Sequence, residues 1–189
     1  MDQTKTKVLL LLAGILLVML ACTIFIGGPD YPSTRIPVST EAVGEFRSTM
    51  EAAVAAGALS GELTITITEE QLTSYLAMKL QEQAKPFLTD PQVTLRDGQI
   101  KVFGTAQQGY FEATISIVLT AGVSDTGELF IEVSSIDFGP LPVPEGIRDA
   151  ISATIEEAYT GAIGPAATGL RLETVQIEDG VMTITGRTQ

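Results

Sequence analysis

Few residues of this chain could do chemistry. Histidine is absent and there is a single cysteine, so a Ser-His dyad, a histidine metal site and a thiolate cluster are excluded. A serine could still act with a lysine, for which Lys79, Lys85 and Lys101 are candidates. The carboxylates of Glu156 and Glu157 could share acid and base roles, but adjacent helical residues point about 100° apart. Solvated surface charge explains these residues, and we expect no enzyme.

Acidic residues close to glycine suggest a calcium loop as a second kind of site. Asp97 and Asp179 each precede a glycine, and Asp125 lies two residues before one. A calcium loop needs a dense set of oxygen ligands, such as the pattern D-x-D-x-D-G, which the sequence does not contain. A two-residue hairpin turn requires Asp before Gly in any case. We therefore expect no metal and no cofactor.

The charge of the chain excludes one class of partner. The sequence has 23 acidic and 11 basic residues, for a net charge of −12. Affinity for nucleic acid comes largely from Lys and Arg that neutralise phosphates, so nucleic acid is not expected to bind. The same sign argues against electrostatic capture by anionic lipid headgroups. An acidic, solubilising surface is the expected consequence.

Residues 8–26 form an apolar run of 19 residues without a charge. As a helix this run would span about 28 Å at ~1.5 Å per residue, which matches the membrane core. Lys5 and Lys7 precede it and favour an N-terminus in the cytoplasm, with the rest of the chain outside. We therefore predict a membrane anchor over residues 1–27, a lipid bilayer as partner through residues 8–26, and a domain outside the cytoplasm.

Two other fates of the apolar run stay open. Cys22, in the sequence Met-Leu-Ala-Cys, loosely resembles a lipoprotein cleavage box, in which the cysteine carries lipid and becomes the mature N-terminus. Ordinary signal-peptide cleavage is the other possibility, although the apolar region of a signal is usually only ~7–15 residues long. In each case the domain works outside the cytoplasm without an internal disulfide, because one cysteine has no partner in the chain.

Residues 28–59 are predicted to be a stalk and a juxtamembrane helix. The stretch 27–40 opens with two glycines and holds three prolines, which leaves little room for a helix or a paired strand. Thr40 can then cap a helix over residues 41–56. The apolar residues of this helix recur at three- and four-residue steps: Val43, Phe46, Met50 and Val54.

The domain proper is predicted over residues 60–189. Residues 63–68 alternate isoleucine and leucine with threonine, which is typical of a half-buried strand. Thr68 and Gln71 form a capping box that opens a helix, and Pro86 is expected to end it. One face of this helix is apolar and carries Leu72, Tyr75, Leu76 and Leu80.

The domain contains the same hairpin sequence pattern twice. VTLRDGQIKVFG (93–104) and VQIEDGVMTITG (175–186) place an apolar residue, Asp-Gly and a closing Gly at equal offsets, 82 residues apart. Asp-Gly between alternating apolar residues is a strong signal for a two-residue hairpin. Each copy follows a predicted helix, so the repeat is interpreted as architectural.

A long meander separates the two hairpins. Every second residue from 111 to 123 is apolar, which predicts a strand of about 43 Å at ~3.3 Å per residue. The return strand starts at Leu129 and Ile131, but its apolar positions change parity before Ile136, so we predict a bulge near Ser134-Ser135 that bends the sheet. A second amphipathic helix follows over about 145–160, with Ile147, Ile151, Ile155 and Ala158 on one face. Two hairpins and the meander are expected to join in one antiparallel sheet that covers helices with its apolar face.

These segments carry a resemblance to a known family. The segment ITITEEQLTSYL, the two hairpins, the long meander, the proline-rich step at 139–144 and the closing hairpin together resemble LmeA-like phospholipid-binding proteins and the similar YpmS-like anchored bacterial proteins. These belong to, or are similar to, the tubular lipid-binding superfamily. The resemblance implies an α+β fold: a long, strongly curved antiparallel sheet wrapped around a helix, with a second helix, here preceded by an N-terminal transmembrane helix. It also implies an apolar groove able to hold acyl chains, and no catalytic motif.

Two functions are compatible with this pattern. The first is a lipid-binding or lipid-transfer module whose partner is membrane lipid. The second is a structural or interaction domain of the cell envelope with a filled core, because a lined groove and a packed core use the same apolar residues. The identity of the lipid, a protein partner and the oligomeric state cannot be read from the sequence. The residues expected to hold an acyl chain are Leu72, Tyr75, Leu76, Leu80, Ile115, Ile117, Leu119, Leu129, Ile131, Ile151 and Ile155.

Overall fold

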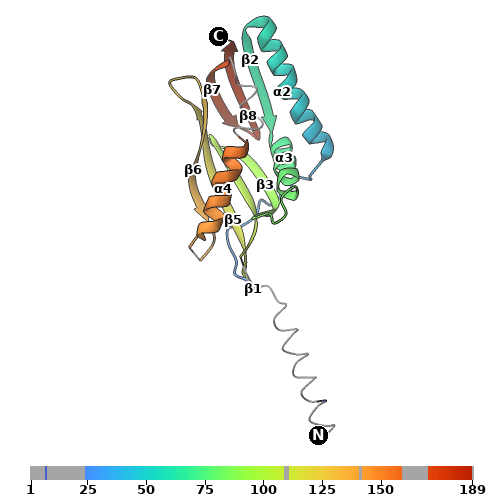
Figure 1. Cartoon of the computed structure of the whole chain (residues 1–189), viewed down its shortest axis with the longest axis vertical. Helices are drawn as coiled ribbons and strands as arrows, with labels where there is room; N and C mark the ends of the chain where they lie inside the picture. The colour runs from blue at the N-terminus through green and yellow to red at the C-terminus, as the bar shows by residue number, and fades with distance from the viewer. Residues whose placement is uncertain (1–6, 8–23, 109–110, 141, 159–169, 189) are drawn as a thin grey trace.

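The computed structural model describes residues 7, 24–108, 111–140, 142–158 and 170–188, which form an α+β domain (Figure 1). Its strands form two sheets that are antiparallel except at one pair, and three helices are described beside them. In chain order the elements are β1 (Ile24–Phe25), α2 (Thr40–Ser60), β2 (Glu62–Thr68), α3 (Glu69–Gln81), β3 (Thr89–Arg96), β4 (Gln99–Gln108), β5 (Phe111–Val123), β6 (Leu129–Asp137), α4 (Glu145–Ala158), β7 (Leu170–Glu178) and β8 (Val181–Thr188).

The large sheet has the order β1-β5-β4-β3, and β6 also pairs with β5. Its central strand β5 has 13 residues and the bounds predicted from the alternation. The pairing of β6 with β5 passes from Ser135 to Val133 and leaves Ser134 without a partner. The predicted bulge is therefore confirmed, with Ser134 as the additional residue.

The small sheet has the order β2-β8-β7, so a strand early in the domain pairs with the final described strand. β2 runs antiparallel to β8 from Glu62 opposite Arg187 to Thr68 opposite Val181. The predicted single sheet is therefore wrong, because β2, β7 and β8 form a sheet of their own. Side chains of all three described helices and of both sheets line a common apolar pocket.

The two copies of the Asp-Gly hairpin meet turn to turn and connect the sheets. Both turns place Asp and Gly at positive φ, as the predicted hairpin type requires. The backbone N–H of Gly98 donates to the carbonyl of Ile177 at 3.1 Å, and that of Gly180 donates to the carbonyl of Leu95 at 2.9 Å. These two bonds join equivalent positions of the repeat reciprocally. The two hairpins therefore do not lie side by side in one sheet. Each belongs to a different sheet, and their turns form the junction between the two sheets.

Helix α3 begins as the sequence predicts and ends earlier. The N–H of Gln71 donates to Thr68 Oγ1 at 3.2 Å, and the N–H of Thr68 donates to Gln71 Oε1 at 3.1 Å, which confirms the capping box. The helix ends at Gln81 and the chain leaves it through a tight turn. Pro86 is therefore not the residue that ends the helix.

Helix α3 also covers the free edge of the large sheet. β3 is an edge strand, and its outward N–H groups would lack partners without a neighbour. The N–H of Val93 donates to Thr73 Oγ1 at 3.0 Å, and the N–H of Leu95 donates to Glu69 Oε1 at 2.8 Å. Thr73 is fully buried. Side chains of the helix thus take the place of a further strand and hold α3 in register with the sheet.

The segment before α2 has no regular structure, as predicted, but it is fastened to the large sheet. The N–H of Thr114 donates to the carbonyl of Gly27 at 3.0 Å. Further along, the N–H of Ile36 donates to the side chain of Gln92 at 2.7 Å. Ser39 caps α2, one position earlier than predicted. The predicted stalk therefore lies along the domain over its described length.

The predicted membrane helix over residues 8–26 lies mostly outside the described residues, and so does Cys22. Its last part is described. Ile24–Phe25 form β1 and pair in parallel with the first two residues of β5, so these residues extend the large sheet and do not continue a helix. Among the helices that the structure describes, none combines the length and the apolar character needed to cross a membrane.

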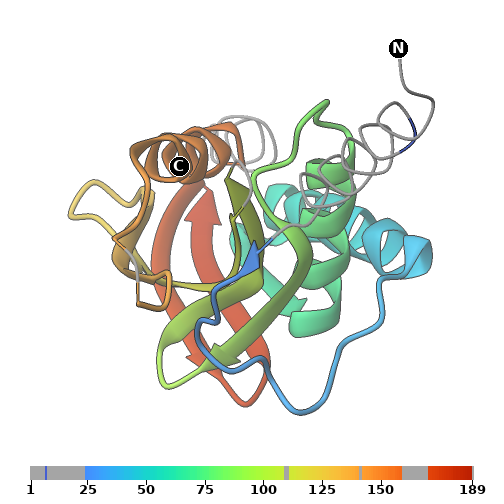
Figure 2. The same ribbon diagram turned by 90° about the horizontal axis from the view of Figure 1, so that it is seen from below.

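Helix α4 faces the rest of the domain through its apolar side. It starts after Pro144, whose carbonyl accepts from the N–H groups of Ile147 and Arg148. Ile147 and Ile151 are buried, and the predicted end of the helix near residue 160 lies outside the described residues. Seen from below, α4 lies on one side of the domain and α2 and α3 lie on the other (Figure 2).

Candidate functional site

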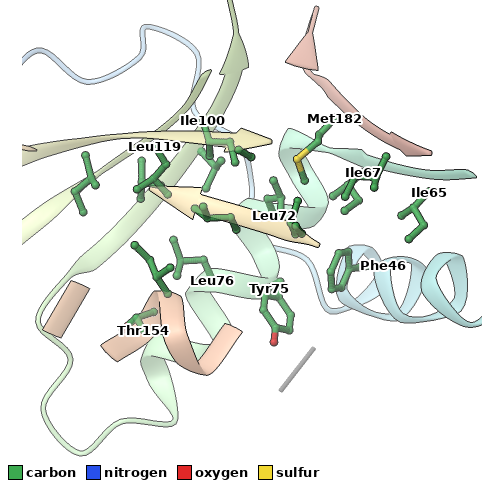
Figure 3. A pocket seen from close by; sticks show the side chains of 18 of the residues that line it. Phe46, Ile65, Ile67, Leu72, Tyr75, Leu76, Ile100, Leu119, Thr154 and Met182 are labelled. Carbon is green, nitrogen blue, oxygen red and sulfur yellow. The ribbon is translucent and has the colours of Figure 1, made fainter. Parts of the chain in front are cut away.

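An apolar pocket of about 200 Å³ lies between the two sheets and the three helices (Figure 3). Every described strand except β1 contributes to its wall. The 24 lining residues are Phe46, Met50, Leu63, Ile65, Ile67, Leu72, Tyr75, Leu76, Phe87, Leu88, Val93, Ile100, Val102, Ile117, Leu119, Ala121, Leu129, Ile131, Ile151, Thr154, Ile155, Leu172, Met182 and Ile184.

The wall of this pocket is almost free of polar groups. Among the lining side chains only Thr154 and Tyr75 carry a polar atom, and none is charged. The ring of Tyr75 packs on Phe46 with 5.1 Å between ring centroids. Its hydroxyl points away from the other labelled side chains in Figure 3. The pocket can therefore desolvate apolar groups, but it offers almost nothing to a polar or charged one.

The volume places this pocket between an internal cavity and a typical ligand site. An apolar cavity of about 150 Å³ stays dry and can hold benzene, whereas pockets for drug-sized ligands measure ~300–1,000 Å³. By the same comparison, six carbon atoms in about 150 Å³, the 200 Å³ pocket has room for about eight carbon atoms of an acyl chain.

Nine of the eleven residues expected to hold an acyl chain line this pocket. They come from α3, β5, β6 and α4, which the fold brings around one space: Leu72, Tyr75, Leu76, Ile117, Leu119, Leu129, Ile131, Ile151 and Ile155. Leu80 and Ile115 do not line it. Both are buried in the surrounding core, with 2% and 0% of their surface exposed.

The contributions of α2 and of the small sheet to the pocket are not among the residues predicted from the sequence. Phe46 and Met50 of α2 reach the pocket, whereas the sequence predicts this helix to lie between anchor and domain. Ile65 and Ile67 of β2 pair with Ile184 and Met182 of β8, and all four line the pocket. The alternation of apolar residues in the sequence predicts both strands. It does not predict that β2 pairs with β8, and this pairing places the four side chains on one wall of the pocket.

A second, shallow hollow of about 510 Å³ lies on the surface between β6 and α4. It shares Leu129, Ile131 and Ile155 with the apolar pocket. Its remaining lining is partly polar and consists of Ser124, Glu128, Phe130, Val133 and Ser152. These three shared side chains thus lie between the apolar pocket and the partly polar hollow.

Three of the titratable residues considered for chemistry have structural roles. Lys79 Nζ donates to Glu82 Oε2 at 3.0 Å, and this hydrogen bond raises the pKa of Lys79. Asp97 and Asp179 occupy the hairpin turns. In the described part of the chain no three His, Cys, Asp or Glu residues are grouped so that they could hold a metal ion.

The fold is an α+β domain with an apolar pocket between its sheets and helices. No protein-family model matches the sequence, and no curated protein matches it. Among solved structures it is similar to the crystal structure of lipopolysaccharide binding protein, at 11% identity and a TM-score of 0.33. The similarity covers 68% of this chain and 50% of the other, so the chain spans half the length of that protein. A likeness this weak assigns no family, and the resemblance to LmeA-like and YpmS-like proteins stays a hypothesis drawn from the residues.

Proposed function

We propose that this domain binds a lipid acyl chain in its apolar pocket. The observation that carries the proposal is an apolar pocket lined by 24 side chains, none of them charged. Each methylene that leaves water contributes about 0.8 kcal/mol. About eight of them would contribute ~6 kcal/mol, from which the cost of ordering the ligand is subtracted. This contribution favours binding without a charged partner group, and no catalytic step is part of the proposed function.

The proposed setting is the outer side of a membrane. Its support is the uncharged run of residues 8–26 behind Lys5 and Lys7. β1 begins at Ile24, and its neighbour Ile26 donates its N–H to Glu112 of β5 at 2.9 Å. A bilayer-embedded run would therefore leave almost no free chain between the membrane and the large sheet. Protease added to intact cells should degrade the domain; a domain protected until the membrane is opened would contradict this location.

The acyl-chain proposal is tested with a photoactivatable fatty acid that cells incorporate into their lipids. After irradiation, peptides of the purified full chain are mapped for lipid adducts. Adducts are expected on pocket peptides that contain Leu72 or Ile117. The variant Ile117→Glu should lose these adducts, because it places an unpaired charge in an apolar site, while Thr120→Glu on the opposite face of β5 should keep them. Folding of both variants is checked by circular dichroism.

A structural role with a filled interior is the second candidate. It is favoured by the modest pocket volume and by the tight core around it, in which Leu95, Ala113 and Ile115 are completely buried. The same experiment separates the two functions. Adducts confined to residues 8–26 of a folded chain, with pocket peptides unlabelled, would favour the structural role.

A further inference from the structure

The volume of the pocket matches one short acyl chain. Its 200 Å³ accommodates about eight carbon atoms, so a second chain of similar length would need about twice this space. The wall cannot be enlarged by moving a single loop, because the lining residues come from both sheets and from all three described helices. The capacity therefore points to a lipid with a single chain.

The polar end of such a lipid has one obvious place in the described structure. The hollow between β6 and α4 adjoins the pocket across Leu129, Ile131 and Ile155. The backbone of α4 makes few close approaches to the other described elements, so the boundary at this seam consists of side chains. A chain whose tail fills the pocket can therefore pass between β6 and α4 and present its head to the hollow.

The chemistry of the hollow selects the head. Its polar groups are the hydroxyls of Ser124 and Ser152 and the carboxylate of Glu128, and no Lys or Arg lines it. Arg171 reaches the same turn, but its guanidinium donates to the carbonyl of Asp125 at 3.4 Å and does not line the hollow. An anionic head would face Glu128 without a compensating cation in the wall. A hydroxyl, ester or amide head would find hydrogen-bond partners there.

We propose that the pocket is selective for a single-chain lipid with an uncharged polar head, with the tail between the sheets and the head in the hollow between β6 and α4. This inference rests on the proposed function and narrows it. It commits to a ligand smaller than a phospholipid and without a phosphate. Glu128 is the residue that sets the preference against an anion.

The test uses the full chain in phosphatidylcholine vesicles that contain one of three probes at equal mole fraction. The probes carry the same diazirine acyl chain and are a monoacylglycerol, a free fatty acid and a two-chain phosphatidylglycerol. After irradiation, the yield of adducts on pocket peptides is measured. The monoacylglycerol should exceed the two-chain probe at least about tenfold, which corresponds to ~1.4 kcal/mol, and it should also exceed the fatty acid at a pH where the fatty acid is ionised.

Two variants test the role of the hollow. Glu128→Lys should raise labelling by the fatty acid relative to the monoacylglycerol. Glu132→Lys makes the same change of charge on an exposed residue of β6 that does not line the hollow, and it should leave the ratio unchanged. The comparison of probes on the unaltered chain needs neither variant to fold.

Each outcome has a defined meaning. Equal pocket labelling by the one-chain and two-chain probes overturns the inference and leaves acyl-chain binding intact. Equal labelling by fatty acid and monoacylglycerol, with no response to Glu128→Lys, overturns the assignment of the head. Absence of pocket labelling by all three probes contradicts the proposed function itself.

Discussion

The substitution Ala121→Leu distinguishes an open pocket from a filled core. Ala121 lies on β5 and lines the pocket. Ala113 lies on the same strand, is completely buried and does not line the pocket. The same change from alanine to leucine at the two positions therefore adds the same atoms to an open space in one case and to a close-packed region in the other.

The expected magnitudes follow from this difference. Leucine adds three carbon atoms to alanine, which contribute about 2 kcal/mol at ~0.8 kcal/mol each if they fill unoccupied space. Ala121→Leu should therefore leave the free energy of unfolding unchanged or raise it by up to about 2 kcal/mol. Ala113→Leu should lower it by ~1–3 kcal/mol, because extra atoms in a packed core force neighbouring side chains and backbone to move.

The assay is urea unfolding of a fragment comprising residues 24–189, which retains every described helix and strand. Unfolding is followed by circular dichroism, and both variants are compared with the unaltered fragment at equal slope of the transition. In labelling experiments Ala121→Leu should also reduce lipid adducts in the pocket, since it occupies the same space. Equal destabilisation by the two substitutions would refute the reasoning, because it would show that no space is available at Ala121.

Two further predictions concern the framework around the pocket. Glu69→Ala should destabilise the domain by ~1–3 kcal/mol, because the buried N–H of Leu95 loses its acceptor. Glu69→Gln should retain most of the stability, and equal urea midpoints for the two variants would contradict this role of Glu69. Gly104→Ala should lower the free energy of unfolding by ~1–3 kcal/mol, because its Cβ would lie 2.3 Å from Leu88 Cδ1. Gly44→Ala in α2, whose Cβ meets nothing within 4 Å, should be neutral or stabilising by up to ~1 kcal/mol. A thermal melt that ranks the two variants in the opposite order would contradict the packing at Gly104.

Local patterns in the sequence predicted the elements and failed to predict how they join. The 13-residue strand β5, the bulge at Ser134 and the capping box at Thr68 all follow from the types of a few neighbouring residues. The division into two sheets depends on the pairing of β2 with β8, which lie far apart in the sequence, and no local pattern contains this pairing. For this reason a single sheet was predicted where two meet.

The candidate site was also predicted only in part, because local patterns do not show how distant elements pack together. Residues on one face of α3 and of β5 could be assigned to a common interior, because their spacing sets their direction. The contribution of Phe46 and Met50 depends on the packing of α2 against α3 and β2. Whether apolar faces leave space between them is a property of three-dimensional packing. The volume of the pocket is therefore information that alternation alone does not contain.

The pairing of β2 with β8 has a consequence for the order in which the domain is made. Residues 62–68 are synthesised more than a hundred residues before their partners at 181–188. Until those partners arrive, one wall of the interior is missing and the edge of β2 is unprotected. Contacts so far apart in sequence slow folding, because the loop between them must be closed first. The nascent domain must therefore keep an aggregation-prone strand without a partner during almost its entire synthesis. A chain interrupted before Met182 and Ile184 would lack part of the apolar wall that lines the pocket of the complete chain.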